Sequence, residues 1–191
     1  MAALYELLGV LLTSFALNLI PFAGPSNLLL ASNAALLVKS DPFTLGFLVA
    51  IGSASAKFIH YLVTFFVGEH IGEKRRKRLD IEGQRVKRWA FLALFVAAAT
   101  PIPDEPVVIP LGLLKYNPIK FYLAFFVGKL SITIIGAYLG NLSQDVLSPL
   151  INQQTLTVIS IVSTIVITVV LLKVDFGKIT EKILKRKTKT V

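Results

Sequence analysis

The sequence predicts an all-α polytopic membrane protein: an inverted repeat of a reentrant helical hairpin plus a transmembrane helix, with an additional C-terminal transmembrane helix. Three observations support this prediction. First, 54% of the 191 residues are hydrophobic and only 16% are charged, against about a quarter charged in soluble domains. Second, prolines interrupt two of the long apolar stretches. Third, the two halves of the chain align with each other at a single offset.

The formal net charge of +9 comes entirely from two segments. Residues 69–88 hold eight Lys/Arg and four Asp/Glu, and residues 173–191 hold seven and two. Basic residues beside apolar spans mark the cytoplasmic side of a membrane. We therefore expect a multi-pass protein of the cell membrane with both segments in the cytoplasm. Because the basic residues lie beside the spans, they do not indicate nucleic-acid binding.

One membrane domain is expected over residues 1–191, in which each span needs about 20 apolar residues. The N-terminal stretch lacks the basic region of a signal peptide, so it is predicted to remain as a helix. In chain order the predicted elements are an N-terminal hydrophobic helix at 4–20, repeat 1 at 21–72, a basic cytoplasmic loop at 73–88, repeat 2 at 89–144, a C-terminal transmembrane helix at 154–173 and a basic cytoplasmic tail at 174–191.

Each repeat is predicted to open with a broken hairpin, at residues 21–38 and 89–114. Proline removes a backbone donor and clashes with the preceding helical turn. Irregular backbone is tolerated at membrane depth only inside protein or beside water. A hairpin that enters and leaves on one side therefore fits better than a straight helix. The residues predicted to break or shape these hairpins are Pro21, Pro25, Pro101, Pro103, Pro106 and Gly112.

The repeat is defined by polar and conformationally special residues at an offset of 76, with no gap between the halves. Each unit continues from its hairpin through a Lys-x-x-Pro link into a helix with a central glycine. The positive-inside rule makes the two units antiparallel across the membrane. Many transporters have this architecture, with a site between the repeats near the midplane. Apolar residues match by chance, so the argument rests on the other pairs: Pro25 with Pro101, Lys39 with Lys115, Pro42 with Pro118 and Gly52 with Gly128.

Four charged residues are predicted to lie deep in the membrane: Lys57 and Lys129 in the spanning helices, and Asp104 and Glu105 at the tip of the second hairpin. A charge at the bilayer centre costs at least ~2.5–3.5 kcal/mol. We therefore expect the acids to pair with the lysines around a polar cleft. They could form a static ion pair that locks the hairpins, or exchange protons and contact a substrate headgroup. Asn27, beside the first break, is expected to cap a half-helix or to contact the headgroup.

The sequence offers no candidate for catalysis, and we expect neither an enzyme nor a bound metal or cofactor. It contains no cysteine and two histidines, too few for a Cys- or His-based metal site. His60 is more simply interpreted as a packed or hydrogen-bonded side chain. Three functions remain open: lipid transport, proton- or ion-coupled export of a small soluble substrate, and organisation of the membrane through the basic segments.

The stretch TPIPDEPVVIPLGLLKYNPIKFYLAFFVGK resembles the second signature of the DedA/VTT (SNARE-associated Golgi protein) superfamily, and it most resembles the YqaA-type branch. The resemblance covers roughly residues 15–141. It implies a transporter-like fold with two reentrant hairpins, and translocation of phospholipids or polyprenyl phosphates by scrambling or flipping, coupled to protons in some relatives. The residues that occupy the signature positions are Pro101, Gly112, Lys115 and Phe121.

This chain also departs from the family pattern. Asn27 stands where a glutamate is usual, and Ala98 and Asp104 stand where arginines are common. Lysines would then bind phosphate in place of arginines, as point charges rather than through bidentate hydrogen bonds. Membrane lipids and protons are the expected partners, and a homo-oligomer stays open. The residues expected to bind substrate or protons are Asp104, Glu105, Lys57, Lys129, Asn27 and Lys115.

Overall fold

The computed structural model describes residues 2–21, 25–68, 87–101 and 103–147, together with single positions between 152 and 166. Every regular element within these residues is a helix, which confirms the predicted all-α class. Most of the basic loop and of the predicted C-terminal helix, and all of the tail, lie outside the described residues. The helices are α1 (Ala2–Leu19), α2 (Asn27–Leu37), α3 (Pro42–Val67), α5 (Glu105–Leu113) and α6 (Pro118–Leu147), with a further helical segment at 87–98.

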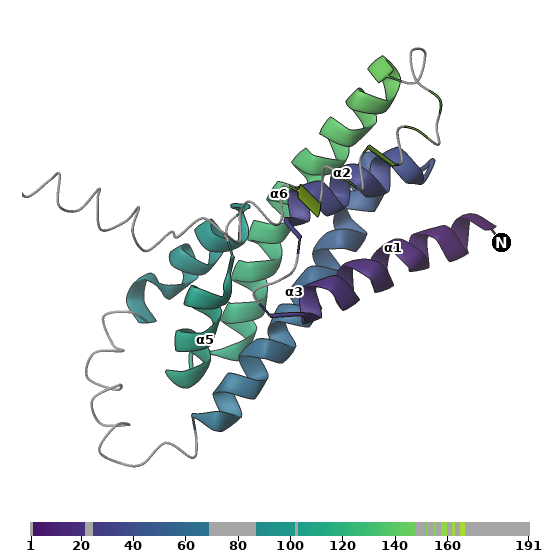
Figure 1. Cartoon of the computed structure of the whole chain (residues 1–191). Coiled ribbons are helices and arrows are strands. Elements are labelled where there is room, and N and C mark those ends of the chain that lie inside the picture. Colours follow the sequence, from purple (N-terminus) through teal and green to yellow (C-terminus); the bar gives the residue numbers. More distant parts are fainter. Residues whose placement is uncertain are drawn as a thin grey trace, which may run out of the picture.

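The two long helices, α3 and α6, form the centre of the molecule and run in opposite directions (Figure 1). Each begins at a proline, whose fixed φ suits the first helical turn. The Asp41 side chain caps α3 by accepting a hydrogen bond from the Thr44 backbone N–H at 2.9 Å. By length and composition, both helices are apolar enough to cross a membrane, over Pro42–Val67 and Pro118–Val146.

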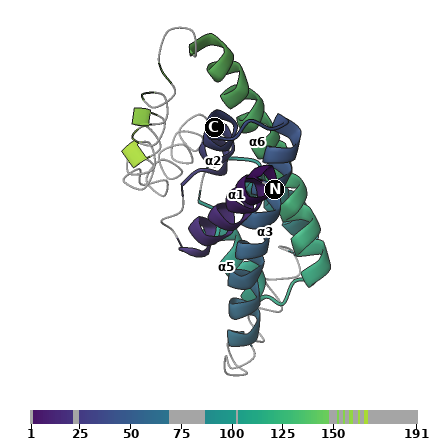
Figure 2. The same ribbon diagram turned by 90° about the vertical axis from the view of Figure 1, so that its right-hand side faces the viewer.

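The shorter helices pack on this long pair. α1 lies against α3, and α2 packs against both α3 and α6, whereas α5 packs against α3. Both views place α1 and α2 toward the end of the molecule where α3 begins, and α5 toward the end where α3 finishes (Figures 1 and 2). The end of α1 nevertheless reaches the second half of α3, because the Leu19 carbonyl contacts the His60 ring nitrogen Nε2 at 2.9 Å.

The predicted breaks are found at most of the proposed prolines. Pro21 and Pro25 lie between α1 and α2, and Pro101 and Pro103 lie between the 87–98 segment and α5. Pro106 instead lies in the first turn of α5, where a missing N–H costs no intrahelical bond.

Gly112 does not break a helix, which corrects its predicted role. It lies inside α5, where an added Cβ would collide with the Thr64 side chain and lie 2.9 Å from the Tyr61 carbonyl oxygen. Glycine is needed there because α5 and α3 approach so closely, and small residues permit such contacts between membrane helices.

Gly52 and Gly128, which the predicted repeat pairs, each lie against a helical segment that precedes a proline-rich break. A Cβ added at Gly52 would contact α1, and one added at Gly128 would contact the 87–98 segment and the residue after it, each at 2.6 Å from a carbonyl oxygen. These glycines are 76 residues apart, but their contact residues are 84 apart. The first connection is therefore eight residues longer than the second. The equivalent contact residues are Leu11 with Phe95, Ser14 with Ala98 and Phe15 with Ala99.

The outside of the molecule is more apolar than the outside of a soluble protein, and its apolar interior also contains buried polar and charged residues. Soluble proteins bury apolar residues and rarely bury charges without partners. Here large apolar side chains cover the outside of every long helix, for example Val63 at 57% and Ile119 at 71% exposure. The buried polar residues are Ser14, Asn18, Asn27, Ser53, Lys57, Asp104, Glu105, Lys129 and Thr133. This pattern fits a helix bundle whose surroundings are lipid.

The interior differs between the two ends of the molecule. Around α5 the core is aromatic, and the Tyr61 and Phe121 rings stack with their centroids 4.1 Å apart. The Tyr61 hydroxyl also donates to the Tyr116 carbonyl oxygen. Around α2 the core consists of small and aliphatic side chains, such as Ala31 and Val49.

Candidate functional site

The four charged residues predicted to lie deep in the chain are all buried in the middle of the bundle. Lys57 lies on α3, 15 residues or about 22 Å along the helix from Pro42, and is 4% exposed. Lys129 lies on α6 and is 2% exposed. Asp104 and Glu105 lie at the start of α5, at 4% and 3% exposure. Helices from both halves of the chain therefore supply the charges.

The acids and lysines form two ion pairs. Lys57 Nζ lies 2.5 Å from Glu105 Oε1, and Lys129 Nζ lies 2.7 Å from Asp104 Oδ2. Because adjacent residues at the break face different long helices, the start of α5 links α3 to α6. The sequence suggested that these four residues meet, and the structure brings them together. Their role in binding substrate or protons stays a prediction.

The two pairs differ in how completely their polar atoms are satisfied. Asp104 Oδ1 is buried and has no hydrogen-bond partner among the described residues. Asp104 occupies the N-cap position of α5, but its side chain makes no capping hydrogen bond. Lys129 also lies over the Phe125 ring, with Nζ 5.2 Å from the centroid. A buried, unpartnered carboxylate oxygen is costly, so this oxygen is the polar atom of the site best placed to accept a proton or a donor from a ligand.

A hydroxyl residue accompanies each of the two lysines on its helix. Ser53 lies one turn before Lys57, and Thr133 lies one turn after Lys129. Each hydroxyl donates to its own helix, to the Ala50 carbonyl at 3.2 Å and to the Lys129 carbonyl at 2.8 Å respectively. Both are buried beside the ion pairs, so they make the centre polar without neutralising either charge.

Asn27 is not part of the charged cluster. Its side-chain amide forms a reciprocal pair with that of Asn18: Asn18 Nδ2 donates to Asn27 Oδ1 at 2.9 Å, and Asn27 Nδ2 donates to Asn18 Oδ1 at 3.1 Å. Asn18 also donates to the Ser14 carbonyl at 2.9 Å. The amide pair joins the last turn of α1 to the first turn of α2. It therefore ties the two helices together across the first break. Two asparagines near that break were the only sign of this pairing in the sequence.

Lys115 lies at the opposite end of α5 from the charged cluster, about 15 Å from Glu105 along the chain's helical rise. Its φ of 51° is in the left-handed region, where a glycine normally ends a helix. The Lys115 N–H donates to Gly112 and the Tyr116 N–H donates to Leu111, which is the Schellman arrangement. Lys115 Nζ lies 5.5 Å from the Phe65 ring centroid.

The described residues contain no group of three or more His, Cys, Asp or Glu side chains that could hold a metal ion. The chemistry available is thus that of two lysines, two carboxylates and neighbouring hydroxyls in a site shielded from water. Such a site can bind an anion through the lysines, or exchange a proton at a carboxylate. The fold and this site define an all-helical membrane protein with charged residues buried between two antiparallel spans.

Comparison with protein families identifies the group. Residues 24–142 match the VTT domain model, so the chain belongs to the VTT domain family, that is, the DedA/VTT superfamily of membrane proteins. The match begins just before α2 and ends within α6, so it includes both long helices and the four charged residues. None of the curated proteins matches the chain, and none of the solved structures does.

Proposed function

We propose that this protein is a transporter that translocates lipid between the leaflets of the cell membrane, as a scramblase or a flippase of phospholipid or polyprenyl phosphate. The observation that supports this most directly is the pair of buried lysine–carboxylate bridges that join the start of α5 to α3 and to α6. A phosphate headgroup that crosses the bilayer needs cationic partners there, because a bare charge at that depth is costly. Lys57 and Lys129 offer such partners from opposite sides.

The architecture under this proposal is an inverted repeat of reentrant hairpins, with the basic loop and C-terminus in the cytoplasm. Three observations support it: α3 and α6 run in opposite directions, α2 packs on α6 while α5 packs on α3, and each long helix meets its own first arm at an equivalent glycine. The N-termini of α2 and α5 both lie at the hairpin breaks. A helix N-terminus carries a partial positive charge, and transporters with broken helices direct such ends at anionic groups.

Translocation would proceed by exchange of partners within the charged cluster. Asp104 has one oxygen without a partner among the described residues, so this oxygen can take up a proton. Protonation neutralises Asp104 and frees Lys129 to bind the phosphate, and the only charge added to the site by this step is that of the proton. Glu105 keeps Lys57 in place. The acyl chains stay in lipid throughout, since the outer surfaces of the long helices are apolar. Proton coupling thus follows from the same residues.

One observation favours a second candidate, proton- or ion-coupled export of a small soluble substrate. All four charged side chains are at most 5% exposed, which suits a proton or small ion more readily than a bulky headgroup. This candidate uses Asp104 in the same way but requires no lipid contact with the lysines.

The experiment that separates these candidates uses purified full-length protein in vesicles. A headgroup-labelled phospholipid and, in parallel, a labelled polyprenyl phosphate are reconstituted in both leaflets, and an impermeant quencher is added outside. Lipid translocation predicts that more than half of either probe is quenched, well above the half seen in protein-free vesicles. Quenching of half of each probe, the same as without protein, would contradict lipid translocation and leave the soluble-substrate exporter.

A further inference from the structure

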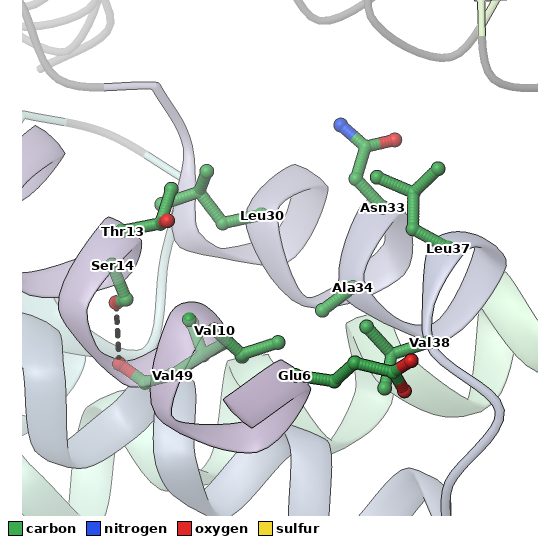
Figure 3. Close-up of a pocket in the computed structure, with 11 residues that line it drawn as sticks. Glu6, Val10, Thr13, Ser14, Leu30, Asn33, Ala34, Leu37, Val38 and Val49 are labelled. Carbon is green, nitrogen blue, oxygen red and sulfur yellow. Dashed lines mark hydrogen bonds between the residues drawn. The ribbon is translucent and has the colours of Figure 1, made fainter. Parts of the chain in front are cut away.

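A groove separates the two arms of the first hairpin, away from the charged cluster. Its volume is about 250 Å³, and α1 and α2 form its sides with Val49 of α3 at its floor (Figure 3). Most of the lining is apolar. The side chains that the argument uses are Glu6, Gly9, Ala34, Val38 and Val49.

Gly9 is exposed and faces open space in this groove, unlike the other described glycines. An added Cβ at each of the other described glycines would meet a neighbouring atom at 3.1 Å or less, but one at Gly9 would meet nothing within 4 Å. Glycine within a helix costs roughly 0.5–1 kcal/mol relative to alanine. No close helix contact explains this cost at Gly9, whereas a ligand lying in the groove would.

One end of the groove is electronegative. The Glu6 side chain extends toward Val38, where α2 ends (Figure 3), and no basic side chain within the described residues pairs with it. The last carbonyl groups of a helix carry a partial negative charge, which adds to that of the carboxylate. This end therefore suits a cation, while the rest of the groove suits a hydrocarbon chain.

We propose that the groove between α1 and α2 binds one acyl chain of a phospholipid with an amine headgroup, whose ammonium group lies at Glu6. The groove is smaller than the 300–1,000 Å³ typical of sites for whole drug-sized ligands, so it holds part of one chain. Within a bilayer there is no hydrophobic driving force for an acyl chain to leave other acyl chains. The selectivity therefore comes from the shape of the groove and the charge of Glu6. This site requires only that the chain lies in a membrane, not that it translocates lipid.

The test is photolabelling of the full-length protein in vesicles of phosphatidylethanolamine and phosphatidylglycerol. A trace of either lipid carries a photoreactive group in its acyl chain, and labelled peptides are identified by mass spectrometry. We expect labelling of α1, α2 or Val49, roughly two- to five-fold stronger with the ethanolamine lipid, the ratio that exposed charge pairs produce. Glu6→Gln should remove the preference between lipids without removing the labelling.

Two further variants make the test decisive. Gly9→Leu fills the groove where the structure has space, so it should reduce labelling of the groove by both lipids while the protein remains folded. Asp145→Asn removes an exposed acid from α6, outside the groove, and should change nothing. Three results would each overturn the proposal. The two lipids could label the wild type equally, or Asp145→Asn could remove the preference as fully as Glu6→Gln does. The third is that the groove residues are found linked to residues 154–172 of the same chain rather than to lipid.

Discussion

Removing Lys57 while leaving Glu105 should destabilise the protein severely, and the structure lets the size of the effect be predicted. Methionine is nearly the same length as lysine and apolar, so Lys57→Met removes the charge without leaving a large cavity. The Glu105 carboxylate, 3% exposed and 2.5 Å from Lys57 Nζ in the wild type, then stays buried but loses its ion pair with Lys57. Breaking a buried pair in this way costs ~3–5 kcal/mol, so Lys57→Met should lower the free energy of unfolding by that amount.

The double variant Lys57→Met with Glu105→Leu tests the reason for this cost. Replacing both members of a buried pair by apolar residues is often neutral or stabilising by ~1–4 kcal/mol, so the double variant should recover most of the lost stability. Ser53→Ala is the matched control, because Ser53 is equally buried on the same helix face but bonds only to its own backbone. It should cost about 1 kcal/mol or less.

Reversible unfolding in mixed micelles of a mild detergent and dodecyl sulfate, followed by circular dichroism, gives the three free energies. The reasoning is refuted if Lys57→Met costs no more than Ser53→Ala. It is equally refuted if the double variant is as unstable as Lys57→Met alone, since Lys57 would then stabilise the protein through contacts other than its bridge to Glu105.

Other substitutions test other parts of the account in the same unfolding assay. Asn18→Leu or Asn27→Leu should each cost roughly 1–3 kcal/mol by leaving the other amide unpaired, whereas the double variant should cost less than the sum; additive costs would contradict the reciprocal pair. Lys115→Ala should be less stable than Lys115→Gly by roughly 1–2 kcal/mol, because the position has a left-handed φ; equal stability would contradict that conformation. Gly52→Ala should be destabilising because a Cβ meets the α1 backbone at 2.6 Å, whereas Gly9→Ala should be neutral or stabilising by up to ~1 kcal/mol; the reverse order would contradict the packing of α1.

The parts of the structure that the sequence predicted depend on residues with strong physical preferences. The long helices were predicted to begin near Pro42 and Pro118, and both do, because proline suits a first turn and excludes an interior position. The meeting of two acids with two lysines followed from the cost of an isolated buried charge. Which lysine pairs with which acid depends on the rotation of α5 about its axis, so the sequence left that open.

The errors arose where the sequence has no such markers. The polar residues of α1 and of the 87–98 segment do not correspond to each other, so nothing in these segments showed that the first connection is eight residues longer than the second. Gly112 was expected to break a helix because glycine is flexible, but it is needed for the close approach of α5 to Thr64. Lys115 was expected to bind substrate because it occupies a signature position, and the length of α5 separates it from the charged cluster; its binding role stays a prediction.

The groove between α1 and α2 has a related explanation. Gly9 and Glu6 lie on an apolar helix whose neighbours cannot be read from the sequence. Only the packed structure shows that Gly9 faces open space while the other described glycines face backbone or side-chain atoms. A single glycine in a helix is therefore informative about a binding site only when its surroundings are known.

The central claim is that the charged cluster at the second hairpin takes part in lipid translocation, and Asp104→Asn tests it most directly. Asparagine keeps the shape of the side chain but can neither neutralise Lys129 nor exchange a proton. The measurement is the rate of phospholipid translocation in vesicles with equal amounts of wild-type and variant protein. We predict that the variant still inserts, and that at equal amounts of folded protein it is slower by roughly tenfold or more, corresponding to at least 1.4 kcal/mol on the barrier. Equal rates for the two proteins would contradict the claim and leave the bridge between Asp104 and Lys129 as a purely structural contact.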